Sequence, residues 1–108
     1  MKTLKDYTNE IVETFKGYEK TGTKPWTYKI AAFDMSYQIG SLAKRIAQLD
    51  GERHAEGLSQ EELKKYAADE LADIFAEVLF IAHDLGIDLE QGWEDMKKSD
   101  EKKIEERS

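Results

Sequence analysis

The spacing of apolar residues along the chain predicts helices throughout. From Thr3 to about Lys20, apolar side chains recur every three or four residues, which places them on one face of a helix. After a break at residues 22–25, a second pattern of the same period runs from about Trp26 to Leu49. No segment alternates apolar and polar residues as a half-buried strand does. The pattern therefore predicts an all-α protein.

The second half of the chain carries start and stop signals for a third helix. Ser59 and Glu62 have the spacing of a capping box, in which each side chain bonds to the backbone N–H of the other. Helical periodicity then continues to Leu85, and Gly86 supplies the residue type that commonly ends a helix. We expect one long helix between these signals.

The remaining segments complete the expected architecture. Asp88 is placed to open a short fourth helix, and the charge-dense segment from about residue 99 is expected to fray. The length of 108 residues is typical of one domain, so we assign residues 1–108 to a single helical domain. Because one short linker joins the second and third helices, these two long central helices should lie antiparallel. The expected fold is a helical bundle of about four helices.

Carboxylates flank the apolar face of the third predicted helix. At about 100° per residue, Glu70 and Glu77 fall within about 20° of each other, and Asp73 lies on the same flank. Like charges at these spacings repel each other, and a bound cation would offset that repulsion. The three acids are therefore candidates for a cation site.

The second predicted helix has a matching row of polar residues beside its apolar face. The row consists of Asp34, Gln38, Ser41 and Arg45. If the two central helices pack through their apolar faces, the two polar rows meet at one edge and form a cleft in which a bundle can hold a metal ion. Acids beside an apolar stripe also occur at ordinary solvated boundaries, so both interpretations stay open.

Charge and composition narrow the possible partners. The net charge of −7 argues against binding to nucleic acid or to an anionic membrane, because both need a positive field. A phosphate-rich ligand would need a divalent cation to bridge the two negative parties. The chain has no cysteine, which excludes disulfides and thiolate chemistry. With neither a signal-peptide pattern nor an apolar stretch of transmembrane length, we expect a cytoplasmic protein without membrane contact.

Two motifs give the chain a family resemblance. They are ELAD at residues 70–73 and LGIDL at residues 85–89. With these motifs, residues 26–103 resemble the MazG family of all-α nucleoside triphosphate pyrophosphohydrolases. In that family a Glu-Leu-x-Asp motif precedes a Leu-Gly-Ile-Asp-Leu turn into a short helix. The resemblance implies a MazG-like fold for most of the chain.

The first metal-binding motif of the family is altered in this chain. The family signature Glu-Glu-x-Gly-Glu-Leu falls on YQIGSL at residues 37–42, so Gln38 and Ser41 stand in place of a metal-binding Glu pair. Their neutral oxygens bind a hard cation more weakly than carboxylates do. Asp34, one turn before Gln38, is a possible replacement. Glu77, one turn beyond the ELAD motif, is another.

The resemblance also implies a reaction and a set of ligands. An NTP or dNTP would be hydrolysed between its α- and β-phosphates to NMP and pyrophosphate, as in house-cleaning enzymes. Mg²⁺, or Mn²⁺ in its place, would neutralise phosphate charge and activate water. Glu70 and Asp73 would be the catalytic metal ligands, joined by Asp34, Gln38 and Glu77.

Candidate substrate contacts are spread over the chain. They are Lys44, Arg45, Arg53 and Lys97 for phosphate groups and Trp26 for a nucleobase. Lysine and arginine are plentiful on protein surfaces, and a tryptophan after a proline often anchors the start of a helix. Structural roles therefore remain open for each of these residues.

The apolar surface of the third helix is wider than a single stripe, which favours partners on more than one side. We expect a homodimer or homotetramer, and relatives in the MazG family likewise build their site between subunits. Two other functions remain open. One is a catalytically weakened, MazG-like nucleotide-binding or regulatory oligomer. The other is a structural helical oligomer whose acids are solvated edges.

Overall fold

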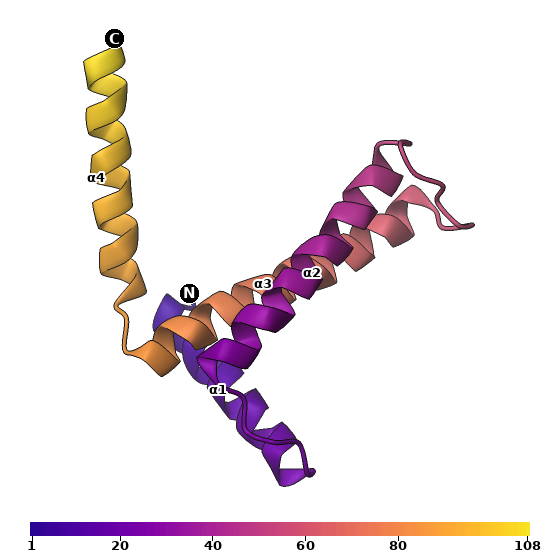
Figure 1. Ribbon diagram of the computed structural model, residues 1–108, viewed down its shortest axis with the longest axis horizontal. Coiled ribbons are helices and arrows are strands. Elements are labelled where there is room, and N and C mark those ends of the chain that lie inside the picture. The colour runs from indigo at the N-terminus through magenta and orange to yellow at the C-terminus, as the bar shows by residue number, and fades with distance from the viewer.

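The computed structural model describes residues 1–108 and contains helices but no strand (Figure 1). In chain order the helices are α1 (Leu4–Lys20), α2 (Tyr28–Leu49), α3 (Gln60–Leu85) and α4 (Leu89–Arg107). The predictions of an all-α class and of about four helices are confirmed. No helix combines the length and the apolar character that crossing a membrane requires.

The helix boundaries follow from capping residues. In the predicted capping box, the Ser59 hydroxyl accepts from the Glu62 N–H at 3.1 Å, and the Glu62 carboxylate accepts from the Ser59 N–H at 3.0 Å. Gly86 ends α3 with φ at 68°, a left-handed conformation that costs glycine little. Helix α2 begins two residues later than predicted because Thr27 serves as its N-cap.

Helices α2 and α3 lie side by side and run in opposite directions (Figure 1). At one end of the pair, the N–H of Tyr28 at the start of α2 donates to Asp84 Oδ2 near the end of α3, at 2.8 Å. At the other end, Gln60 Nε2 at the start of α3 donates to the carbonyl of Leu49, which ends α2, at 3.4 Å. The predicted antiparallel pairing of the two long central helices is confirmed.

Helix α1 packs against α3 through aromatic side chains. The ring of Phe15 lies 4.7 Å from that of Phe80 on α3 and 5.1 Å from that of Trp26, which precedes α2. Further along, Tyr7 meets Phe75 edge-on at 5.7 Å between ring centroids. These contacts fasten α1 to the α2–α3 pair through the favourable geometries of aromatic rings.

Helix α4 differs from the expectation. The prediction of a short fourth helix was wrong, because α4 continues to Arg107, through the segment from residue 99 in which we expected fraying. After Gly92 the chain has no glycine or proline, and acidic and basic residues at helical spacing support continued helix. The helix makes at most marginal contact with the others and projects away from them (Figure 1). The packed bundle therefore consists of α1, α2 and α3.

The interior of the molecule is small. The buried apolar residues are Ala31, Leu63, Ala67, Leu79, Phe80 and Ala82, and the buried polar residues are Gln48, Glu70 and Glu77. The radius of gyration is 17.4 Å, against about 13 Å for a compact domain of this length. Because polar side chains make up a third of the buried residues, the contact between α2 and α3 is not an ordinary apolar core.

Candidate functional site

The two predicted polar rows meet between α2 and α3, and we call them together the polar seam. The seam consists of Asp34, Gln38, Ser41 and Arg45 from α2 and Glu70, Asp73 and Glu77 from α3. Of the two open interpretations, the solvated edge does not fit Glu70 and Glu77, since Glu70 is 7% exposed and Glu77 is 3% exposed. The polar rows lie between α2 and α3, where the two helices touch, and the apolar row of each helix lies to the side of this contact.

Glu70 is held by two residues of α2. The hydroxyl of Ser41 donates to Glu70 Oε1, and Arg45 Nε lies 3.7 Å from the same oxygen. The second oxygen, Oε2, is buried and has no hydrogen-bond partner. Ser41 therefore positions Glu70 and leaves one carboxylate oxygen available to a ligand.

Arg45 connects the seam to the loop after α2. Its Nη1 donates to Gln48 Oε1 at 3.1 Å, and its guanidinium lies over the ring of Tyr66 at 4.6 Å. The Nε2 of Gln48 in turn donates to the carbonyl of His54 at 3.1 Å. Stacking on an aromatic ring and a bond to a fixed amide hold the arginine in place beside Glu70.

Sequence reasoning missed Gln48 and Tyr66, although a signal for both was present. Gln48 continues the polar row of α2 by one further step of three residues, and Tyr66 precedes Glu70 by one turn on α3. Residues three and four apart lie on the same side of a helix, so both belong to the faces that meet. Each polar row could therefore have been extended by one turn, to Gln48 on α2 and to Tyr66 on α3.

Glu77 is the ionisable group of the seam with the fewest polar partners. Neither of its carboxylate oxygens has a hydrogen-bond partner. Burial raises the pKa of Glu77 to about 8, and the nearby carboxyls of Asp34 and Asp73 add to the shift. Asp34 is near enough to favour a proton on Glu77, although the two groups are not aligned in a hydrogen bond. Glu77 is consequently protonated at neutral pH when no cation is present.

The other end of this acidic group is more open. Asp73 is classed as exposed, but its carboxyl is still partly desolvated, and this desolvation is the main cause that raises its pKa. Repulsion from the negative charges of Asp69, Asp34 and Glu70 raises the pKa further. Gln38 Nε2 donates to Asp34 Oδ2 at 3.5 Å, a weak bond between neighbours one turn apart on α2. The amide of Gln38 thus lies next to Asp34 and leaves its carbonyl oxygen as a possible donor atom for a cation.

The acidic side chains follow the seam as a row and do not converge on one point. No three histidine, cysteine, aspartate or glutamate side chains are arranged to share a metal ion. A cation held by both Glu70 and Asp73 would require these side chains to turn toward each other. The chemistry of the donors, carboxylate and amide oxygens, is that of a hard cation site.

A hollow of about 530 Å³ opens on the surface beside the seam. It is lined by Ser36, Tyr37, Gly40, Ser41, Lys44, Arg45 and Arg53. Three of these residues are cationic and none is acidic, although the chain as a whole has a net charge of −7. Ser41 and Arg45 belong to both the hollow and the seam, so an anion in the hollow would lie next to Glu70.

The structure brings together some of the predicted substrate contacts. Lys44, Arg45 and Arg53 share the hollow, where Lys44 Nζ also lies 3.6 Å from Glu56 Oε1. Lys97 is on α4, which does not pack against α2 or α3. Trp26 precedes α2 and packs on Phe15, away from the hollow. Phosphate contact by Lys97 and base stacking by Trp26 stay predictions.

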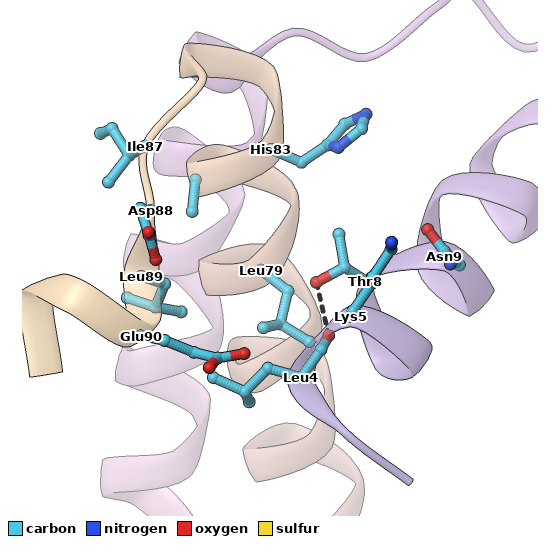
Figure 2. A pocket seen from close by; sticks show the side chains of 11 residues that line it. Leu4, Lys5, Thr8, Asn9, Leu79, His83, Ile87, Asp88, Leu89 and Glu90 are labelled. Atoms are coloured by element: carbon cyan, nitrogen blue, oxygen red, sulfur yellow. Dashed lines mark hydrogen bonds between the residues drawn. The ribbon is translucent and has the colours of Figure 1, made fainter.

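A second hollow, of about 380 Å³, lies between α1, the end of α3 and the start of α4, and Figure 2 shows its lining. Two of its polar side chains, those of Thr8 and Asp88, already bond to local backbone groups. The Thr8 hydroxyl donates to the carbonyl of Leu4 at 2.7 Å, and Asp88 accepts from the Gln91 N–H at 3.0 Å as the cap of α4. None of the predicted site residues lines this hollow, so the polar seam remains the candidate site.

No family model, curated protein or solved structure matches this chain.

Proposed function

We propose that the protein is a Mg²⁺-dependent nucleoside triphosphate pyrophosphohydrolase that cleaves NTPs or dNTPs to NMP and pyrophosphate. The observation that carries the proposal is the set of buried acidic oxygens without partners, Glu70 Oε2 and both oxygens of Glu77. A buried polar atom without a partner is costly, and a cation would satisfy these acceptors. The ELAD and LGIDL motifs, which resemble the MazG family, support the same activity.

The cationic hollow supports a phosphate-bearing substrate. Lys44, Arg45 and Arg53 provide charge-assisted donors for phosphate oxygens. Arg45 also lies beside Glu70, at 3.7 Å, which places the hollow next to the acidic groups. A triphosphate bound there would present its phosphates to a cation held by the seam.

The altered first motif is compatible with Mg²⁺ binding. Mg²⁺ usually keeps several waters and is held by one or two protein carboxylates together with substrate phosphates, so a full set of four acids is not required. Glu70 and Glu77 would supply the carboxylates, with Asp34, Gln38 and Asp73 as further oxygen donors. When bound, the cation would neutralise phosphate charge and lower the pKa of an attacking water. Ser41 would orient Glu70 through its hydrogen bond.

A product assay tests this proposal directly. Purified protein is incubated with a panel of NTPs and dNTPs in Mg²⁺ or Mn²⁺, and NMP and pyrophosphate are quantified. We expect turnover that falls at least tenfold in Glu70→Gln and in Glu77→Gln. Glu61→Gln, an exposed acid in the first turn of α3, is the matched control and should keep full activity. Absence of pyrophosphate release from every substrate would refute the hydrolase.

One observation favours a second candidate, a MazG-like nucleotide-binding or regulatory module with weakened catalysis. Glu70 is already engaged by Ser41 and lies beside Arg45, and no three acids converge on a shared ion. This candidate predicts nucleotide binding by calorimetry without turnover. The double variant Gln38→Glu/Ser41→Glu should then gain metal binding and hydrolysis that the native chain lacks. Turnover by the native chain contradicts it.

A further inference from the structure

Gln48 is a buried amide near the end of α2 that forms hydrogen bonds through both of its polar atoms. The residue is 2% exposed. Its oxygen Oε1 accepts from Arg45 Nη1 at 3.1 Å, and its nitrogen Nε2 donates to the carbonyl of His54 at 3.1 Å. Because a buried polar group is costly without such bonds, the amide holds both partners at fixed positions relative to each other.

The helix does not need these two bonds in order to end. The N–H groups of Glu52 and Arg53 both donate to the carbonyl of Ala47, at 2.9 Å and 3.2 Å, and so close the last turn of α2. An apolar side chain in place of Gln48 would fill the same buried space without any polar atom to satisfy. The amide therefore has a role other than helix termination.

That role concerns Arg53, the residue before His54 in the loop after α2. The N–H of Arg53 bonds to Ala47, and the carbonyl of the next residue bonds to Gln48. The backbone on both sides of Arg53 is thus fixed to the end of α2, and its side chain lines the cationic hollow. The guanidinium of Arg53 takes part in none of the ion pairs of the chain. Arg53 is therefore a cation of the hollow that no acid of the chain balances.

Arg45 lines the same hollow from α2. Its guanidinium is held by Gln48 Oε1 and by the ring of Tyr66, and Glu70 balances part of its charge. Gln48 accordingly joins two arginines that reach the hollow from different segments of the chain. Guanidinium groups match the oxygens of phosphate, and donors that are already fixed lose less conformational entropy when an anion binds.

We propose that Gln48 is a positioning residue that sets the relative placement of Arg45 and Arg53, so that the hollow binds two or more linked phosphate groups. Each arginine can contact a different phosphate group of a pyrophosphate or triphosphate, whereas a single phosphate offers fewer oxygens to the pair. Lys44 adds a third cation, although Glu56 Oε1 lies 3.6 Å from its Nζ. The inference rests on the proposed function, since the ligand is the triphosphate of that substrate, but the binding requires neither a bound cation nor hydrolysis.

Titration calorimetry of the full chain with inorganic phosphate, pyrophosphate and tripolyphosphate tests the proposal. A chelator is present, so that no divalent cation takes part. We expect the native chain to bind tripolyphosphate at least about tenfold more tightly than phosphate, because the longer anion can contact both arginines. Gln48→Met removes both bonds at similar volume and should weaken tripolyphosphate binding by about tenfold. Gln60→Met is the matched control and should keep the native affinity, because Gln60 also bonds to a carbonyl at the end of α2, that of Leu49, but to no arginine.

A double-mutant cycle separates positioning from a general effect on the fold. Arg53→Met alone should weaken tripolyphosphate binding. If Gln48 acts through Arg53, Gln48→Met should cause a smaller further loss in the Arg53→Met chain than it causes in the native chain. Losses that simply add would show that Gln48 does not position Arg53 and would overturn the proposal.

A measurement on the native chain covers the case in which Gln48→Met fails to fold. The side-chain amide protons of Gln48, followed by NMR, should exchange with water more slowly when tripolyphosphate is bound, and those of Gln60 should not. Unchanged exchange at Gln48 contradicts the proposal, as does a native chain that binds tripolyphosphate no better than phosphate. Binding that depends on Gln48 in a chain without turnover would support this inference and refute the hydrolase. Turnover without such binding would do the reverse.

Discussion

At the scale of single residues, Glu77 is the group that the fold treats least like a solvated acid. Burial raises its pKa to about 8 from an ordinary value of 4.5. Between these two values the folded chain keeps a proton that the unfolded chain has released. Stability must therefore decrease as pH rises through this window, because protonation favours the folded state.

Glu77→Gln tests this linkage. The amide removes the cost of ionising a buried carboxyl, so we expect the variant to be more stable than the native chain at pH 8 by about 1–3 kcal/mol and similar to it at pH 5. Urea unfolding at a series of pH values measures both. Glu61→Gln, on the exposed first turn of α3, should leave the pH profile unchanged. A native chain whose stability rises between pH 5 and pH 8 would contradict the assignment.

Arg45 gives a second prediction at this scale. Arg45→Met keeps the aliphatic stem but removes the charge beside buried Glu70, whose remaining partner would be Ser41. Because an uncompensated buried carboxylate is costly, we expect a loss of about 2–4 kcal/mol in the free energy of unfolding at pH 7. Lys44→Met, at the adjacent and more exposed position, should cost less than about 0.5 kcal/mol. Equal losses in the two variants would show that Arg45 does not balance Glu70.

At the scale of elements, the contrast is between α4 and the α2–α3 pair. Helices α2 and α3 support each other along their length, but α4 makes at most marginal contact with the other helices. An isolated helix of this length is marginally stable in water, since most helical stability in proteins comes from tertiary packing. We therefore expect α4 to unfold locally far more often than the packed helices do.

Amide hydrogen exchange tests the independence of α4. We expect amides in Glu94–Lys103 of α4 to exchange at least a hundredfold faster than amides in the middle of α3, around Ala76. Both segments are read from the same sample, so α3 is the internal control. Protection of α4 equal to that of α3 would show that α4 packs on another surface, such as a second copy of the chain.

At the scale of the whole molecule, the proposed cation site in the polar seam predicts that a divalent cation stabilises the fold. Mg²⁺ or Mn²⁺ should raise the melting temperature of the native chain, because a ligand that binds only the folded state stabilises it by mass action. The shift should be larger at pH 8.5 than at pH 6.5, since binding at Glu77 must displace its proton. Calorimetric melting with and without the metal measures the shift in melting temperature. Protein freed of metal with a chelator is the reference.

The control variant again separates the site from general charge effects. The metal-dependent shift should disappear in Glu77→Gln and persist in Glu61→Gln, which lies at the exposed start of α3. A shift of equal size in both variants would place the cation outside the polar seam.

The presence of four helices and the limits of α3 could be read from local signals, whereas the length of α4 was predicted wrongly. Capping by Ser59 and Glu62 and the glycine stop at Gly86 act within a few residues, so the sequence determined the bounds of α3. The period of the polar rows likewise identified the seam residues in advance. The bond from Ser41 to Glu70 confirms that the rows of α2 and α3 meet.

Only the tertiary structure decided which face of each helix turns inward. Periodicity fixes the angle between Glu70 and Leu71 around α3, but it does not say which of the two directions faces a neighbour. The cleft considered from the sequence required the apolar rows to lie between the helices, whereas Glu70 is buried and Leu71 is half exposed. The lack of packing around α4 could not be predicted from local sequence either, because contacts between distant segments depend on how all the helices pack together. Local chemistry thus determined the elements and the members of the seam, and long-range packing decided their burial.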